Sequence, residues 1–119
     1  MVKEAYCSFE VAKLLKEKGF DEPVQHFYKF DSKELYRGTV FTNTQIGDKF
    51  YNAPTHQMAM AWLREVHNIF IVIEPYSNTS CYFSLWEGDN YYENPLRKGF
   101  PSYEETVEQA LKYCLKKNN

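Results

Sequence analysis

The chain lacks the features that mark membrane-spanning, secreted and phosphate-binding proteins. No apolar run approaches the ~18 residues of a membrane-spanning helix, and no signal-peptide pattern is present. The five glycines are scattered singly, so no glycine-rich loop is available to hold a phosphate. We therefore expect a soluble, cytoplasmic protein with no membrane partner.

An excess of positive charge is also missing. The sequence holds 14 Lys plus Arg against 16 Asp plus Glu, a formal charge of −2, and the two signs are interspersed. A nucleic-acid-binding protein usually carries a basic excess or a basic stripe. The charge balance therefore argues against a nucleic-acid partner.

Cysteine is scarce and unpaired. Cys7, Cys81 and Cys114 are an odd number and include no CxxC pair, which favours free thiols in a reducing compartment. Cys7 lies just before a predicted helix N-terminus, a position that lowers the pKa of a thiol, so it is a conceivable nucleophile. No residue context marks a base beside it.

The three histidines show no metal-ligand pattern. His56 and His67 lie on one side of a predicted helix, but eleven residues at a rise of about 1.5 Å separate them by about 16 Å. No cysteine or carboxylate lies at a ligand spacing nearby, and His26 would have to join them through the fold. We therefore expect no metal and no cofactor. A small enzyme using Cys7 or His56 is kept as an alternative.

Aromatic residues are the compositional outlier, at 18% of the 119 residues. A chain of 14.2 kDa forms one domain and can bury about two thirds of its surface, so most aromatic rings belong to a core. The hydroxyls of the ten tyrosines, however, must reach water or a partner.

The clearest structural signal is the segment 54–75. Thr55 is the predicted N-cap of a helix, and Asn68 ends it, because asparagine tolerates the left-handed conformation of a C-terminal cap. Residues 69–73 are then five apolar residues in a row, which predicts a strand covered on both faces. The helix residues that share a buried face are Ala59, Trp62, Leu63 and Val66.

The same signals predict the remaining elements of a single α+β domain over residues 1–119. The elements follow the order α-β-β-α-β-β-(β)-α, with a loop at residues 42–49. Because the connections are short, we expect a mainly antiparallel sheet of four to five strands, with three helices packed against it. The other predicted helices begin at the N-cap Ser8 and at the Ser102/Glu105 capping box, and the other predicted strands cover residues 24–30, 35–41, 50–51, 81–87 and 91–93.

The hairpin of strands 69–73 and 81–87 has no polar face. If its isoleucines face the helices, the alternate residues form a second apolar face. Helices or the first hairpin could cover that face, it could bind another subunit or a protein partner, or it could stack bases or sugars. The candidate partner-binding residues are Phe70, Tyr82, Trp86, Tyr91 and Tyr92.

The C-terminal half has the helix, three strands and helix order of a double-stranded-RNA-binding domain. That family places lysines at the start of its last helix to contact phosphates. The matching positions here are Glu104 and Glu105, which would repel phosphates. A nucleic-acid-binding accessory protein is therefore an alternative rather than the first hypothesis.

Three segments carry a family resemblance: residues 8–21, residues 53–75 and residues 102–115. The most specific pattern is Pro-Thr-x6-Trp-Leu-Arg, from Pro54 to Arg64. These segments resemble a family of small uncharacterised proteins of phages, prophages and other mobile elements of gut bacteria. The resemblance implies a cytoplasmic mobile-element accessory protein, with no cofactor or catalytic residue to carry over.

The hypothesis that the sequence favours is a non-enzymatic protein-interaction module. Its partner would be a host or phage protein, or a second copy in a homodimer. Aromatic side chains are favoured as interface anchors because they bury a large area at little rotamer cost.

Overall fold

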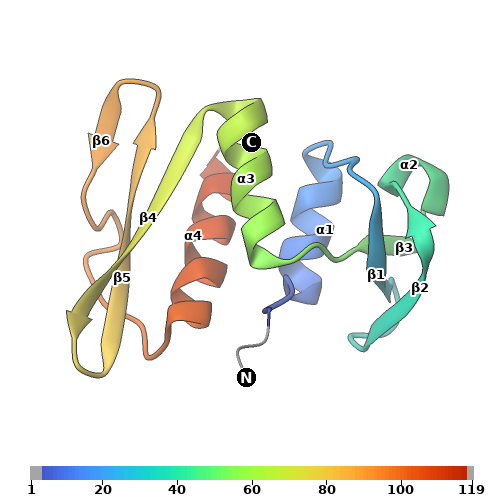
Figure 1. Cartoon of the computed structure of the whole chain (residues 1–119), viewed down its shortest axis with the longest axis horizontal. Coiled ribbons are helices and arrows are strands. Elements are labelled where there is room, and N and C mark those ends of the chain that lie inside the picture. The colour runs from blue at the N-terminus through green and yellow to red at the C-terminus, as the bar shows by residue number, and fades with distance from the viewer. Residues whose placement is uncertain (1–3, 118–119) are drawn as a thin grey trace.

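The computed structural model describes residues 4–117, with the backbone alone for residue 117. Helices and strands alternate along the chain in an α+β arrangement (Figure 1). The helices are α1 (Phe9–Glu17), α2 (Asn43–Ile46), α3 (His56–His67) and α4 (Tyr103–Lys117). The strands are β1 (Val24–Lys29), β2 (Leu35–Phe41), β3 (Phe50–Asn52), β4 (Ile69–Ser77), β5 (Ser80–Glu87) and β6 (Asn90–Tyr92).

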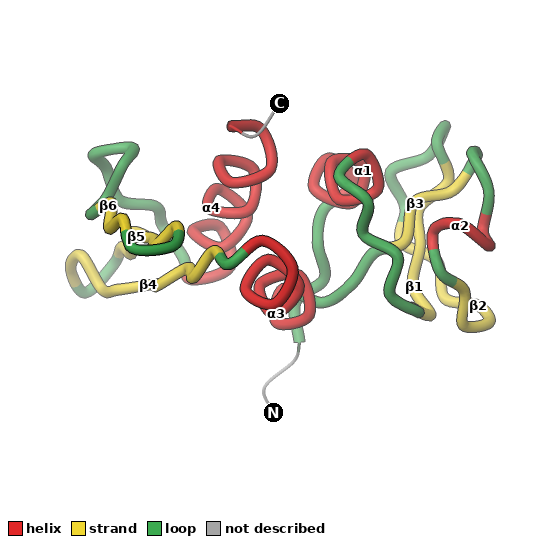
Figure 2. The backbone as a smooth tube through the Cα atoms, turned by 90° about the horizontal axis from the view of Figure 1, so that it is seen from above, coloured by secondary structure: helices red, strands yellow, loops and turns green. Residues whose placement is uncertain are grey.

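The strands form two separate sheets, with the orders β2-β1-β3 and β4-β5-β6, and every pairing is antiparallel. Helices α1, α3 and α4 lie between the two sheets (Figure 2). The expectation of one sheet with four to five strands is therefore wrong, although its antiparallel pairing is confirmed. The sheet divides because each three-residue strand, β3 and β6, adds to its own hairpin, and α3 separates the two hairpins.

Local signals placed the ends of α1 and α3 correctly. The hydroxyls of Ser8 and Thr55 each accept a hydrogen bond of 3.2 Å from the backbone N–H three residues further on, as N-caps do. Gly19 and Asn68 follow the two helices with φ angles of +94° and +55°. The expectation for Val66 is wrong: it is exposed, because the core ends before the last turn of α3.

The predicted loop at residues 42–49 contains the short helix α2. Thr42 and Gln45 form a capping box at its start, which is the local signal for this helix. The buried Asn43 side chain donates to the Phe20 carbonyl at 2.8 Å and accepts from the Asn52 amide at 2.9 Å. The helix thereby connects the end of α1 to β3.

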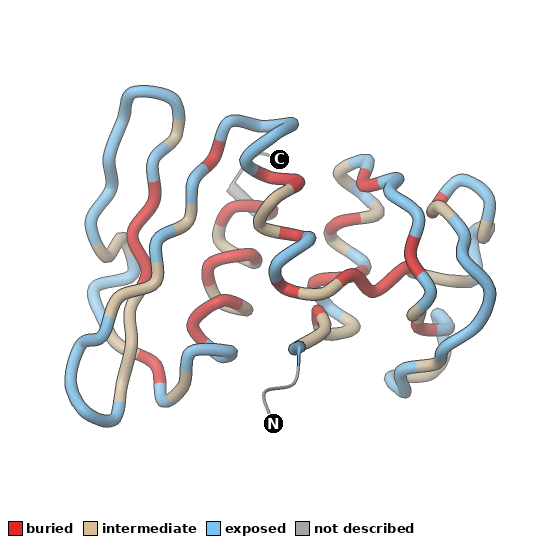
Figure 3. Tube along the Cα trace, in the orientation of Figure 1, coloured by how far each residue is buried: buried red, intermediate tan, exposed pale blue. Residues whose placement is uncertain are grey.

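Two groups of buried residues hold the layers together. Figure 3 marks the buried residues in red along the chain. The larger group lies between α1, α3, α4 and the inner face of β4 and β5, and includes Leu15, Leu63, Phe83 and Leu111. The smaller group joins α1 to β1 and consists of Ala12, Tyr28 and Ala53, with Phe9 and Tyr51 packed against it. Each sheet is therefore packed against helices on one face.

The outer face of β4 and β5 is open at Phe70, Val72 and Trp86, although Ser84 on the same face is fully buried. Ile69 is buried against the helices, as expected from the alternation along the strand, whereas Phe70 and Trp86 are exposed. Helix α4 packs against the inner face, and no helix lies on the other side (Figure 2). The expectation of a strand covered on both faces, by helices or by the first hairpin, is therefore wrong for the described chain.

We predict that Phe83→Ala lowers the free energy of unfolding by about 3–5 kcal/mol, the usual cost of removing a fully buried phenylalanine. Phe83 has no exposed surface and its ring packs on Tyr113. The matched control is Phe30→Ala, because Phe30 is more than half exposed and its loss should cost no more than about 0.5 kcal/mol. Urea denaturation followed by circular dichroism measures both, and equal losses would contradict the described core.

Candidate functional site

The first candidate site is a row of aromatic side chains on the outer face of β4-β5-β6. Phe70 pairs with Trp86, and Trp86 pairs with Tyr91, so the three side chains lie on one face of adjacent strands. They are 45%, 43% and 45% exposed, and the Trp86 and Tyr91 rings lie 4.9 Å apart. We call Phe70, Trp86 and Tyr91 the aromatic row.

The structure does not bring the other two predicted partner-binding residues into this row. Tyr92 pairs with Leu85, whose side chain is buried against the helices, so Tyr92 belongs to the opposite face of the sheet. Tyr82 lies on the outer face but is separated from the row by Ser84, which is fully buried and accepts a hydrogen bond from the Asn94 amide at 3.2 Å.

Tyr82 instead belongs to a shallow hollow of about 440 Å³ next to Tyr76, Asn94 and Arg97. Its ring contacts that of Tyr76 at 5.5 Å in an edge-to-face arrangement. Partial desolvation and a hydrogen bond with Glu74 raise the pKa of Tyr82 above its ordinary value. The hydroxyl is therefore neutral and already has a partner within the chain.

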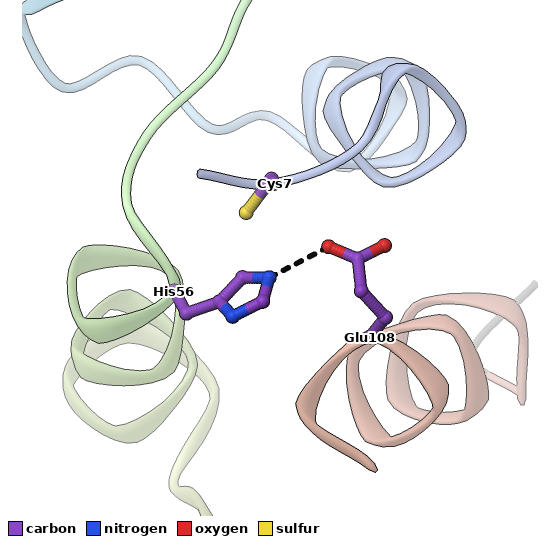
Figure 4. Close-up of side chains that lie close together, drawn as sticks. All are labelled: Cys7, His56 and Glu108. Carbon is purple, nitrogen blue, oxygen red and sulfur yellow. Dashed lines mark hydrogen bonds and ion pairs between the residues drawn. The ribbon is translucent and has the colours of Figure 1, made fainter. Parts of the chain in front are cut away.

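The second candidate site is the cluster of Cys7, His56 and Glu108, which come from three different elements (Figure 4). Cys7 lies just before the N-cap of α1, His56 is the first residue of α3, and Glu108 lies in the second turn of α4. One sulfur, one imidazole nitrogen and one carboxylate oxygen all lie within 4.8 Å of one another. Cys7 is 0% and His56 5% exposed.

A short antiparallel ladder positions two of these residues. Segments 5–7 and 54–56 run side by side and exchange two backbone hydrogen bonds of 2.9 Å, with the amides of Cys7 and His56 as donors. The ladder brings the N-terminal ends of α1 and α3 together. It therefore holds a thiol and an imidazole at the same place although they are far apart in the sequence.

Hydrogen bonds to Glu108 and Cys7 complete the cluster. His56 Nε2 and the Ser8 amide both donate to Glu108 Oε2, at 2.7 Å and 3.0 Å. The Tyr28 hydroxyl donates to the Cys7 carbonyl at 2.7 Å, which ties the cluster to β1. Three helices and one strand thus meet here.

Burial sets the ionisation of these groups. Burial alone would raise the pKa of Glu108, but the hydrogen bonds from His56 and Ser8 outweigh it and hold the pKa below its ordinary value. Burial, and next the nearby Glu108 charge, raise the pKa of the Cys7 thiol well above its ordinary value. The expectation that the helix N-terminus lowers this pKa is therefore wrong. At neutral pH the thiol keeps its proton and is buried, which does not suit a free nucleophile.

A hollow of about 340 Å³ lies beside the cluster. It is lined by His56 together with Thr55, Tyr103 and Glu104, among others. This volume is at the lower end of the range of small-molecule pockets. It gives the otherwise buried imidazole a neighbouring space that water or a small ligand can enter.

Sequence reasoning missed this cluster because its members are 49 and 52 residues apart, so no local spacing marks them. One signal was present. Glu108 stands three residues before Leu111 and seven before Leu115, both buried, so a carboxylate occupies a position of the apolar stripe of α4. A carboxylate on a buried stripe requires a partner.

Comparison with protein-family models, with curated proteins and with solved structures finds no match to this chain. None of the helices in residues 4–117 combines the length and the apolar character that crossing a bilayer requires.

We predict that Tyr28→Phe lowers the free energy of unfolding by about 1–3 kcal/mol, because the buried Cys7 carbonyl loses its donor. Tyr36→Phe is the control, since the Tyr36 hydroxyl bonds Glu34 at an exposed position.

The effect of Tyr28→Phe should also depend on pH. Burial raises the pKa of Tyr28 to about 12, above the value of about 10 in an unfolded chain. The stability contributed by the protonated hydroxyl is complete below pH ~10 and is lost as the pH rises toward ~12. Denaturation at a series of alkaline pH values should show the wild-type advantage shrinking, and a constant advantage would contradict the buried hydroxyl.

Proposed function

We propose that the protein is a non-enzymatic interaction module that binds a second copy of itself through the aromatic row. The observation that supports this is the exposure of Phe70, Trp86 and Tyr91 side by side on the outer face of β4-β5-β6. Contiguous exposed aromatic surface on a small domain marks interaction sites. Tryptophan and tyrosine are enriched among the residues that dominate binding energy.

The area of the surface is consistent with a dimer contact. Aromatic side chains bury about 150–250 Å² each, so three that are nearly half exposed offer roughly 300 Å². Val72, exposed on the same face, and the neighbouring backbone of β4 extend the surface. A standard interface buries about 800 Å² per partner, so the aromatic row would form its centre and the surrounding polar groups its rim.

A second copy is the occupant that the chemistry of the face favours. A two-fold interface brings the same patch of both chains together, so the patch must be complementary to a copy of itself in shape and charge. The aromatic row and Val72 carry no charged side chain, and therefore two copies stacked face to face bring no like charges together at the centre. Two sheets packed in this way lie about 10 Å apart, with the rings of one between those of the other.

Two further parts of the proposal rest on the sequence resemblance. We propose a cytoplasmic location and an origin in a phage or another mobile element. A chain of this origin would meet host and phage proteins, and one of them could compete with the second copy for the same face. Such a protein would bind when the dimer dissociates and exposes the aromatic row.

We predict that Trp86→Ala weakens self-association at least tenfold while the chain stays folded. Light scattering and sedimentation over a concentration series should give the wild type a mass approaching twice 14.2 kDa, and the variant a mass near 14.2 kDa at the same concentrations. Circular dichroism checks the fold of each sample.

The matched control is Phe41→Ala, which removes an exposed aromatic ring from β2 in the other sheet. It should leave the dimer unchanged. A wild type that stays monomeric at high concentration, or a Trp86→Ala variant that dimerises as well as the wild type, would refute the proposal. Duplex RNA binding at low salt would point to the nucleic-acid alternative instead.

A further inference from the structure

We propose that Cys7, His56 and Glu108 form a binding site for a zinc-like transition-metal ion, with the Cys7 Sγ, the His56 Nε2 and a Glu108 carboxylate oxygen as ligands. This inference is independent of the aromatic row, because the three residues lie at the start of α1, at the start of α3 and in α4, whereas the aromatic row lies on β4-β5-β6.

The donor set selects the kind of ion. Thiolate sulfur, imidazole nitrogen and carboxylate oxygen are the three ligand types of protein zinc sites. Calcium and magnesium prefer oxygen ligands alone, so a site with sulfur and nitrogen disfavours both. Zinc, or an ion that replaces it such as cobalt, is therefore the class that fits.

The distances fit after a small adjustment. Ligand atoms around a tetrahedral zinc ion, each about 2.0–2.3 Å from the metal, lie roughly 3.5 Å from one another. In the metal-free chain the three donor atoms lie within 4.8 Å of one another, and His56 and Glu108 are 2.7 Å apart through their hydrogen bond. The ion would take the place of the proton between His56 Nε2 and Glu108 Oε2. These two atoms would move apart by less than about 1 Å, and the Cys7 Sγ would move toward them.

The surrounding backbone holds the ligands in place before an ion arrives. The ladder between segments 5–7 and 54–56 fixes Cys7 and His56, and the Ser8 amide orients the Glu108 carboxylate from the side of α1. Hydrogen bonds that orient ligands in this way are a regular feature of metal sites. The site is also largely dry, which strengthens the attraction between the ion and its ligands.

The proton balance is simple. Binding releases the thiol proton of Cys7 to solvent, because the thiolate is the form that coordinates. For His56 Nε2 to coordinate, the proton that it donates to Glu108 moves to Nδ1, so the imidazole itself releases none. Each bound ion therefore releases one net proton.

Three protein ligands leave one tetrahedral position open. Zinc sites with three protein ligands usually hold a water molecule in the fourth position. The hollow beside His56, lined also by Thr55 and Glu104, provides room from which that water can enter. The site therefore matches zinc centres that keep an exchangeable water more closely than closed structural centres with four protein ligands.

Metal titration of the full chain tests the proposal. Isothermal titration with ZnCl2 should show one ion per chain and the release of one proton. Zinc should also raise the unfolding temperature of the wild type, since an ion that binds the folded state stabilises it. The variants Cys7→Ser, His56→Gln and Glu108→Gln should each weaken binding at least tenfold. Cys81→Ser is the matched control, because this half-buried cysteine lies outside the cluster, and it should bind like the wild type.

Cobalt provides a readout that does not depend on the folding of the ligand variants. In Cys81→Ser/Cys114→Ala the Cys7 thiol is the only one left, and the Co²⁺ complex should show a thiolate-to-cobalt charge-transfer band with tetrahedral d–d bands. A cobalt spectrum without a thiolate band would overturn the site. So would the absence of saturable zinc binding, or zinc binding that is unchanged in Cys7→Ser and His56→Gln.

Discussion

The fold depends on the junction where segments 5–7 and 54–56 pair. Two backbone hydrogen bonds join the start of α1 to the start of α3, and the Glu108 carboxylate adds α4 through the Ser8 amide and His56. The main hydrophobic core lies between these same three helices and the sheet β4-β5-β6. The junction thereby sets how the helical layer presents one face to each sheet. Without it, the β2-β1-β3 sheet would be connected to the rest mainly through the packing of α1.

Sequence reasoning succeeded where the determining interactions are local. Ser8 and Thr55 cap helices through bonds to residues three positions away, and Asn68 adopts a left-handed conformation that its own side chain tolerates. These signals are complete within a few residues. The division into two sheets is different, because β3 pairs with β1 across more than twenty residues and nothing in the sequence of residues 50–52 specifies that partner. The cluster of Cys7, His56 and Glu108 depends on still more distant contacts.

The open face shows a limit of a different kind. The alternation along residues 69–73 and 81–87 correctly separated the two faces, and it placed Phe70 and Trp86 together. The prediction that the rest of the chain covers the second apolar face was wrong. The alternation of residues along a strand shows which side chains share a face, but it does not show what packs against that face. The exposed apolar residues of this face are what a second copy of the chain would cover. The same observation that corrected the fold prediction thus supports the interaction proposal.

Burying Cys7, His56 and Glu108 together costs folding free energy, so a contribution to stability does not explain why these residues are there. An ionised carboxylate and an imidazole lose their hydration when they are buried, and their mutual attraction offsets only part of that free-energy cost. Well-packed apolar residues at the same positions often give a folded state that is equally stable or more stable. Two hydrogen bonds offset part of that cost for Glu108. The hydrogen bond described for the Cys7 thiol is a weak one, a contact of 3.9 Å to the Thr55 carbonyl. A thiol in that position adds little to the hydrogen bonding, whereas a metal ion would use all three side chains at once. The presence of sulfur, nitrogen and oxygen donors at one dry junction is therefore better accounted for by a ligand that needs them than by the packing of three helices.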